Sequence, residues 1–213
     1  MEGDQFQATP TGAAQGSIVS PLLANIALHG MEVDLQKVFK RQQRPTLIRY
    51  ADDLVALHPE LSVVQATQAT QAFLSQWLKP MGLELKPSKT KITHTLVPHQ
   101  GQVGFVFLGY EVRQYRVGKT HSKQGFKTII KPSREAQKRQ LHRIRQIVRT
   151  HQAAPQVSLI AHLNPVIRGW ANYYANACSK VTFNSMDARL YHKLRAWARR
   201  HTQNSASLIY CEQ

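Results

Sequence analysis

Two adjacent carboxylates, Asp52 and Asp53, are the residues whose types and spacing most directly suggest chemistry. They lie in Leu47-Ile-Arg-Tyr-Ala-Asp-Asp-Leu-Val-Ala-Leu57, between two short apolar runs that are typical of β-strands. Hard divalent cations such as Mg²⁺ take oxygen ligands and are usually held by one or two carboxylates together with substrate phosphates. The segment therefore predicts a hairpin whose tip holds a metal for phosphoryl transfer. The alternative is an Asp-Asp turn that only faces water.

Helices are predicted on both sides of this hairpin. Ser20 as the cap and Pro21 at the first position begin a helix whose apolar residues continue at helical spacing to Val38. A second helix has Ser62 as its cap and ends at Gly82, where a glycine commonly follows the last turn. The hairpin is thus expected to lie against two amphipathic helices.

The second half of the chain changes character. Residues 101–113 and their neighbours read as short strands, and the pattern becomes helical and basic from Ser133 onward. Another helix is expected with Asn164 as its cap and Pro165 at its first position, and a third between residues 185 and 200. The prediction is an α+β fold, with helices on a small antiparallel sheet, followed by an all-α basic three-helix bundle.

The net charge of +16 is unevenly placed. Residues 1–111 hold 9 Lys and Arg against 9 Asp and Glu, whereas residues 112–213 hold 19 against 3. A basic block of this kind attracts phosphate backbones through counterion release, so nucleic acid is the predicted partner. A solvated surface without a partner and an acidic membrane surface are the alternatives.

Cysteine content and hydropathy exclude several classes of protein. Cys178 and Cys211 are too few for a disulfide framework and lack the spacing of a structural zinc site. No apolar run is long enough to span a bilayer, and the first residues have no signal-peptide pattern. We expect a cytoplasmic protein that does not bind membranes, with a nucleoid or organellar location as an alternative.

Five ordered blocks between residues 11 and 200 resemble the reverse transcriptases and maturases encoded by group II introns. The resemblance rests on Gln15-Gly-Ser-Ile-Val-Ser-Pro-Leu-Leu-Ala-Asn25, Tyr50-Ala-Asp-Asp53, Leu85-Lys-Pro-Ser-Lys-Thr-Lys91, Phe107-Leu-Gly-Tyr110 and Leu163-Asn-Pro-Val-Ile-Arg-Gly-Trp-Ala-Asn-Tyr-Tyr174. In this family they correspond to a block near the incoming nucleotide, the catalytic hairpin, the following strand, the primer-grip turn and the signature of the thumb, also called domain X. The resemblance implies three domains: a partial reverse transcriptase palm at 1–111, connecting strands at 112–132 and a thumb at 133–213.

The resemblance implies roles for individual residues. Asp52 and Asp53 would hold Mg²⁺, and Gln15, Gly16, Ala51 and Lys89 would lie near the nucleotide. A solvated strand end is the alternative for Lys89. Gly109 would let the primer backbone approach. Phe107, Tyr110, Trp170 and Tyr174 are expected in the core rather than at nucleic acid. The predicted RNA-binding residues are Arg134, Lys138, Arg139, Arg143, Arg145 and Arg168.

The chain also departs from the family pattern. A polymerase of this family needs a third metal-binding aspartate upstream of Gln15, and only Glu2 and Asp4 precede it here. The residues before Gln15 do not match the family's fingers and first palm strands, and Ala13-Ala14 replaces the usual Thr-Pro. No Cys-pair or His-Asn-His cluster of an endonuclease is found in residues 175–213, so target cleavage is not expected of this sequence.

Three hypotheses follow. The first is a nucleotidyltransferase that makes DNA on an RNA template with a DNA primer and aids splicing and mobility of its intron RNA, with an upstream fragment supplying the rest of the palm. The second is a non-catalytic module that binds group II intron RNA. The third is a truncated relic without polymerase activity, with an exposed sheet edge.

Overall fold

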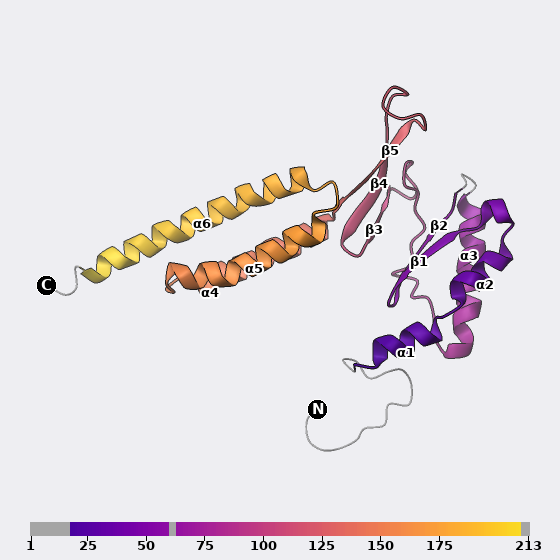
Figure 1. Ribbon diagram of the computed structural model, residues 1–213, viewed down its shortest axis with the longest axis horizontal. Helices are drawn as coiled ribbons and strands as arrows, with labels where there is room; N and C mark the ends of the chain where they lie inside the picture. Colours follow the sequence, from indigo (N-terminus) through magenta and orange to yellow (C-terminus); the bar gives the residue numbers. More distant parts are fainter. Residues whose placement is uncertain (1–17, 60–62, 210–213) are drawn as a thin grey trace, which may run out of the picture. The chain divides into compact units, whose positions relative to one another are not determined.

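The computed structural model describes residues 18–59 and 63–209. The chain forms two compact units: unit 1 ends at Ile92, and unit 2 begins at Thr93. The helices and strands of unit 1 are shown in Figure 1 and are α1 (Ser20–Ala27), α2 (Met31–Val38), the 3-10 helix η1 (Arg41–Gln43), β1 (Thr46–Tyr50), β2 (Asp53–Leu57), α3 (Val63–Leu78) and the 3-10 helix η2 (Lys79–Met81).

The core of unit 1 lies between helices α2 and α3 and one face of the β1–β2 hairpin. Met31 and Leu35 of α2 are fully buried, and they cluster with Leu47 of β1 and Leu74 of α3. Met31 and Leu35 are four residues apart, so they share one face of the helix. Apolar burial on this one face fixes the register of the hairpin, because a slip of one residue would expose Leu47.

The predicted helix from Ser20 to Val38 is two helices. Gly30 has a φ of 86° and forms the N-cap of α2, so the chain leaves the helical conformation after α1. A glycine inside a helix is about 1 kcal/mol less favourable than alanine, and the apolar spacing across Gly30 did not reveal this break. The predicted cap was also wrong, since the N-cap of α1 is Val19, without a side-chain capping bond.

The second predicted helix ends as expected, but the segment after it does not form a strand. Helix α3 leads into η2, and Gly82 follows with a φ of 68° and donates its N–H to the carbonyl of Lys79 at 3.0 Å. The predicted cap, Ser62, lies outside the described residues. The expected strand at residues 85–91 is instead interrupted by a turn at residues 87–89, in which the Lys89 N–H donates to the Lys86 carbonyl at 3.0 Å.

His58 joins the end of β2 to helix α3. Its Nε2 lies 2.9 Å from the hydroxyl of the buried Thr70, and burial lowers the pKa of the imidazole from its ordinary value of 6.5. A histidine whose pKa is lower in the folded state favours folding above the unfolded pKa, and this contribution is lost as the pH falls below it. The neutral form therefore stabilises unit 1.

We expect unit 1 to be less stable at about pH 5.5 than at about pH 7.5, because the unfolded state binds the extra proton. Urea unfolding followed by circular dichroism at the two pH values measures this difference. His58→Gln should reduce it, whereas His29→Gln, at an exposed position, should not. An equal pH dependence in both variants would contradict the assignment to His58.

Unit 2 combines a three-stranded antiparallel sheet with long helices (Figure 1). Its elements are β3 (Phe105–Phe107), β4 (Tyr110–Arg116), β5 (Phe126–Pro132), α4 (Arg134–Thr150), α5 (Gln156–Tyr174) and α6 (Lys180–Ile209). The strands thus belong to the same compact unit as the helices that follow them. The division into sequence domains at 1–111, 112–132 and 133–213 stays a prediction. Within residues 18–59 and 63–209, no helix combines the length and apolar character needed to cross a membrane.

The helices of unit 2 begin partly where the sequence predicts. Helix α4 starts after Ser133, whose hydroxyl accepts a hydrogen bond from the Ala136 N–H at 3.1 Å. The predicted start of α5 was wrong: Pro155 is its N-cap, and Pro165 lies inside the helix. Leu159 and Leu163 are buried at helical spacing before the proline, and this packing stabilises the helix although the proline removes one backbone hydrogen bond. Helix α6 begins at Lys180, before the predicted residue 185.

The β3–β4 turn docks on the end of α5. Leu108 and Gly109 both have positive φ values, 49° and 80°, as in the two-residue turns that suit twisted hairpins. The Tyr173 hydroxyl donates to the Leu108 carbonyl at 2.9 Å, and the Tyr174 hydroxyl donates to the Gly109 carbonyl at 3.3 Å. A Cβ atom on residue 109 would lie 2.5 Å from the Tyr174 hydroxyl oxygen. Glycine is required here by the tyrosine of α5 as well as by the backbone.

Gly109→Ala should therefore lower the free energy of unfolding of unit 2 by about 1 to 3 kcal/mol, from the positive φ and the contact with Tyr174. Gly125→Ala is the matched control, because Gly125 also has a positive φ of 74° but has open space where a Cβ would lie. Urea unfolding should show a larger loss for Gly109→Ala. In a Tyr174→Phe background the difference should shrink, and an unchanged difference would refute the steric explanation.

Candidate functional site

The two predicted metal-binding carboxylates lie at the tip of the β1–β2 hairpin. Tyr50 pairs with Asp53 at the last rung, so Ala51 and Asp52 are the two central residues of the turn. Ala51 has a φ of 53°, a left-handed conformation that is unfavourable for a residue with a Cβ. The surrounding ladder therefore holds a turn that alanine would not adopt by preference.

Strand alternation decides which way Asp53 faces. Leu54 and Ala56 pack against the core formed with α2 and α3, so Asp53, the neighbour of Leu54, belongs to the opposite face of the hairpin. Asp52 and Asp53 are both exposed. On the same face Tyr50 is 63% exposed and Ile48 is 42% exposed. The carboxylates thus border an open surface whose back is fixed by the buried core.

The hairpin is also tied to helix α1. Arg49 of β1 donates from Nη1 to the Asn25 side-chain oxygen at 2.7 Å. Asn25 is the last residue of the block predicted to approach the nucleotide, and the first residues of that block, Gln15 and Gly16, lie outside the described residues. This hydrogen bond links the hairpin to the C-terminal end of the block, which is the part of the block that the structure describes.

The donors at the hairpin tip fit a magnesium ion in kind. Both are carboxylate oxygens, both are accessible, and such sites are commonly completed by water and substrate phosphates. Within the part of the chain that the structure describes, no group of three or more His, Cys, Asp or Glu side chains comes together. A complete metal site would therefore combine the carboxylates of Asp52 and Asp53 with oxygen atoms from other sources, such as water and substrate phosphates.

The other predicted nucleotide and primer residues are more scattered. Ala51 lies beside the carboxylates in the turn, whereas Lys89 is exposed in the turn after Pro87. Gly109 lies in unit 2, where Tyr174 occupies the space beside its Cα. Helix α5 is thus one reason for a glycine at this position, and the predicted primer contact of Gly109 stays a prediction. The expected core position of Tyr174 is confirmed by its 4% exposure.

The predicted RNA-binding side chains are all exposed, but they do not form one surface. Five lie on α4, and by helical geometry Arg134, Lys138 and Arg145 share one face. Arg139 and Arg143 belong to a different side of the helix. Consistent with this, Arg139 lies close enough to α5 to oppose the burial that raises the pKa of Tyr174. Arg168 is exposed on α5.

Sequence reasoning did not select three further cations that the fold brings to Arg145. Arg149 continues the face of Arg134, Lys138 and Arg145, and a search at helical spacing would have found it. Lys193 and Arg200 come from α6 and line the same space between α4 and α6. Only the packing of the two helices brings these side chains together.

Two comparisons with known families agree with this arrangement. Residues 1–112, just over half of the chain, match the family described as "Reverse transcriptase (RNA-dependent DNA polymerase)". Residues 137–209 match the family described as "Group II intron, maturase-specific domain". No curated protein matches the sequence significantly. The first match contains the Asp52-Asp53 hairpin, and the second contains most of α4 and all of α5 and α6. The chain therefore belongs to the reverse transcriptase family, as an intron-encoded reverse transcriptase/maturase.

Proposed function

We propose that this chain takes part in RNA-directed DNA synthesis and in the binding of its group II intron RNA, which aids splicing and mobility. The observation that carries the first part is the pair of exposed carboxylates at the tip of a hairpin whose other face is buried. Catalysis of phosphoryl transfer depends mostly on positioning and electrostatics, and a rigid hairpin supplies both.

Members of this family generally use divalent metal ions. In our proposal Asp52 and Asp53 hold Mg²⁺, which would activate the primer 3′ hydroxyl and neutralise the leaving pyrophosphate. The buried core that contains Leu47 supports the hairpin that carries these carboxylates, and the Arg49–Asn25 hydrogen bond links the hairpin to helix α1. Gln15, Gly16, Ala51 and Lys89 are proposed to contact the nucleotide, and Gly109 the primer.

The second part of the proposal rests on charge. Unit 2 carries 19 Lys and Arg against 4 Asp and Glu. We assign RNA contacts to the predicted cations Arg134, Lys138, Arg139, Arg143, Arg145 and Arg168. The same imbalance favours a second candidate function, in which unit 2 binds intron RNA and the chain by itself polymerises nothing. An upstream fragment that supplies the rest of the palm is proposed for the first candidate.

The test is extension of a DNA primer on an RNA template by the purified chain, with Mg²⁺ or with EDTA, and with or without a separately produced fingers and upper-palm fragment. The polymerase proposal predicts extension with Mg²⁺ that EDTA abolishes. RNA binding measured in parallel should persist in EDTA, because the Lys and Arg contacts need no metal. Binding without extension under every condition would leave the RNA-binding module.

A further inference from the structure

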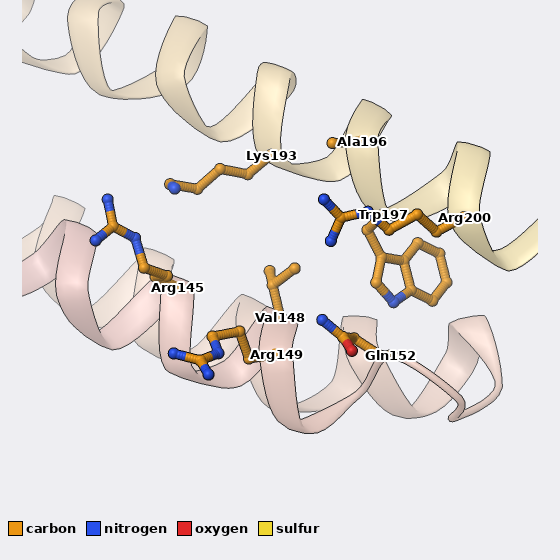
Figure 2. A pocket seen from close by; sticks show the side chains of 8 residues that line it. All are labelled: Arg145, Val148, Arg149, Gln152, Lys193, Ala196, Trp197 and Arg200. Carbon is orange, nitrogen blue, oxygen red and sulfur yellow. The ribbon is translucent and has the colours of Figure 1, made fainter.

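A groove lined by four cations runs between helices α4 and α6. Figure 2 shows Arg145 and Arg149 on α4 and Lys193 and Arg200 on α6, with their side chains extending along the space between the two helices. The remaining lining residues are Val148, Gln152, Ala196 and Trp197. Among the residues that the structure describes, no acidic side chain lines the groove.

The floor of the groove is rigid and apolar. Trp197 is 9% exposed, and its indole Nε1 donates to the His151 carbonyl at the end of α4 at 2.7 Å. This bond ties α6 to the C-cap of α4 and uses the only hydrogen-bond donor of the indole. Val148 and Ala196 are the other apolar residues of the lining. The cations therefore project from two helices whose spacing is fixed by packing.

The four cations lack counterions in the part of the chain that the structure describes. The ion pairs there join Lys37 to Asp34 and Lys131 to Glu111, and neither includes a side chain of the groove. Like charges held together repel one another, and an anion in the groove would relieve this repulsion. The arrangement thus favours a ligand with several negative charges.

The spacing of the cations fits an extended polyanion. Arg145 and Arg149 are four residues apart, so their positions are separated by roughly 6 Å along the axis of α4. The same face continues toward Lys138 and Arg134, and Lys193 and Arg200 form the facing row on α6. Lys193 and Arg200 are seven residues apart, so they are separated by roughly 10 Å along the axis of α6, more than one small anion would bridge. A strand with regularly repeated phosphates could span this distance.

We infer that the groove between α4 and α6 binds the sugar-phosphate backbone of an RNA strand. This rests on the proposed function and adds the site: Arg149, Lys193 and Arg200 join Arg145 as its phosphate contacts. Arginine forms charge-assisted, often bidentate bonds with phosphate. Gln152 is the one neutral polar side chain in the lining, and the indole donor of Trp197 is already used, so the polar groups of the groove are mostly cations. Contacts of cations with phosphates carry no sequence information, and in this inference they supply most of the binding.

The test compares binding of a fluorescein-labelled oligouridylate by the full chain and by the variant Arg149→Gln/Arg200→Gln across a range of salt concentrations. Each lost phosphate contact lowers the slope of log affinity against log salt by about 0.7 for a single strand, so the variant should lose about 1.4. The matched control is Lys119→Gln/Lys123→Gln, which removes the same charge from exposed positions outside the groove. It should lose less than half as much.

The conservative variant Arg149→Lys/Arg200→Lys should keep the wild-type slope, which guards against misfolding as the cause of weaker binding. Equal slopes for the groove and control variants would overturn the inference while RNA binding itself stands. A second outcome would also overturn the inference. If inorganic phosphate at constant ionic strength displaces the oligouridylate by occupying the groove with one phosphate per protein, the groove is a site for a small anion. If the full chain does not bind the oligouridylate, the proposed RNA-binding function fails too.

Discussion

Asp52→Asn is expected to abolish primer extension, with a loss on the order of 10³-fold or more. The change removes one negative charge from the turn and replaces a strong metal ligand by a weak one. Metal ions contribute several kcal/mol of charge stabilisation in phosphoryl transfer, and each 1.36 kcal/mol is about tenfold in rate. The measurement is the rate of primer extension on an RNA template. The reaction includes the fingers and upper-palm fragment if the unchanged protein needs this fragment for extension.

The matched control for this prediction is Glu84→Gln, which removes one negative charge from an exposed carboxylate of unit 1 that lies outside the hairpin. It should extend primers at close to the unchanged rate. Asp53→Asn should reduce the rate strongly, because its carboxylate borders the same open face. Oligouridylate binding should be retained in all three variants. Extension that survives Asp52→Asn would show that the activity belongs to another site or to a contaminant.

Leu35→Ala should lower the free energy of unfolding of unit 1 by about 2 to 5 kcal/mol. Leu35 has no exposed surface and packs with Met31, Leu47 and Leu74. Truncation would leave a cavity directly behind β1, the strand that leads into the metal-binding turn. Urea unfolding, with a probe that reports on unit 1, measures the loss. Primer extension by Leu35→Ala should be lost at a lower temperature than extension by the unchanged protein.

Val38→Ala, on the same helix, is the control for Leu35→Ala. Val38 is 55% exposed, and substitutions at such positions usually change stability by no more than about 0.5 kcal/mol. RNA binding by unit 2 should be retained in both variants, because the groove cations and their supporting helices lie outside unit 1. A loss of stability as large for Val38→Ala as for Leu35→Ala would contradict the described core.

The sequence was sufficient to predict the elements with strong local signals. The two short apolar runs on either side of Asp52 and Asp53 predicted a hairpin, and β1 and β2 form one. Gly82 ends its helical segment as expected, because a residue with positive φ there is usually glycine. The family was also evident from short blocks, since any one block could arise by chance but five of them in this order rarely do.

The two errors in helix boundaries have different causes. Pro165 is an ordinary first residue of a helix, yet the buried positions Leu159 and Leu163 continue the helix through it, so packing overrides the local preference. At Gly30 the apolar spacing suggested one helix, but the backbone turns there and separates α1 from α2. This break follows a local preference, because glycine is unfavourable inside a helix and readily adopts a positive φ.

The sequence by itself determined that this protein carries paired carboxylates in a hairpin and a strongly basic second half, since residue types and short apolar runs are properties of the chain. Only the tertiary structure decided that Arg145 and Arg149 share a groove with Lys193 and Arg200. Only the tertiary structure, likewise, showed that Gly109 makes room for Tyr174. These residues are distant in sequence, and the contacts between them depend on how helices pack, which is set by many side chains together.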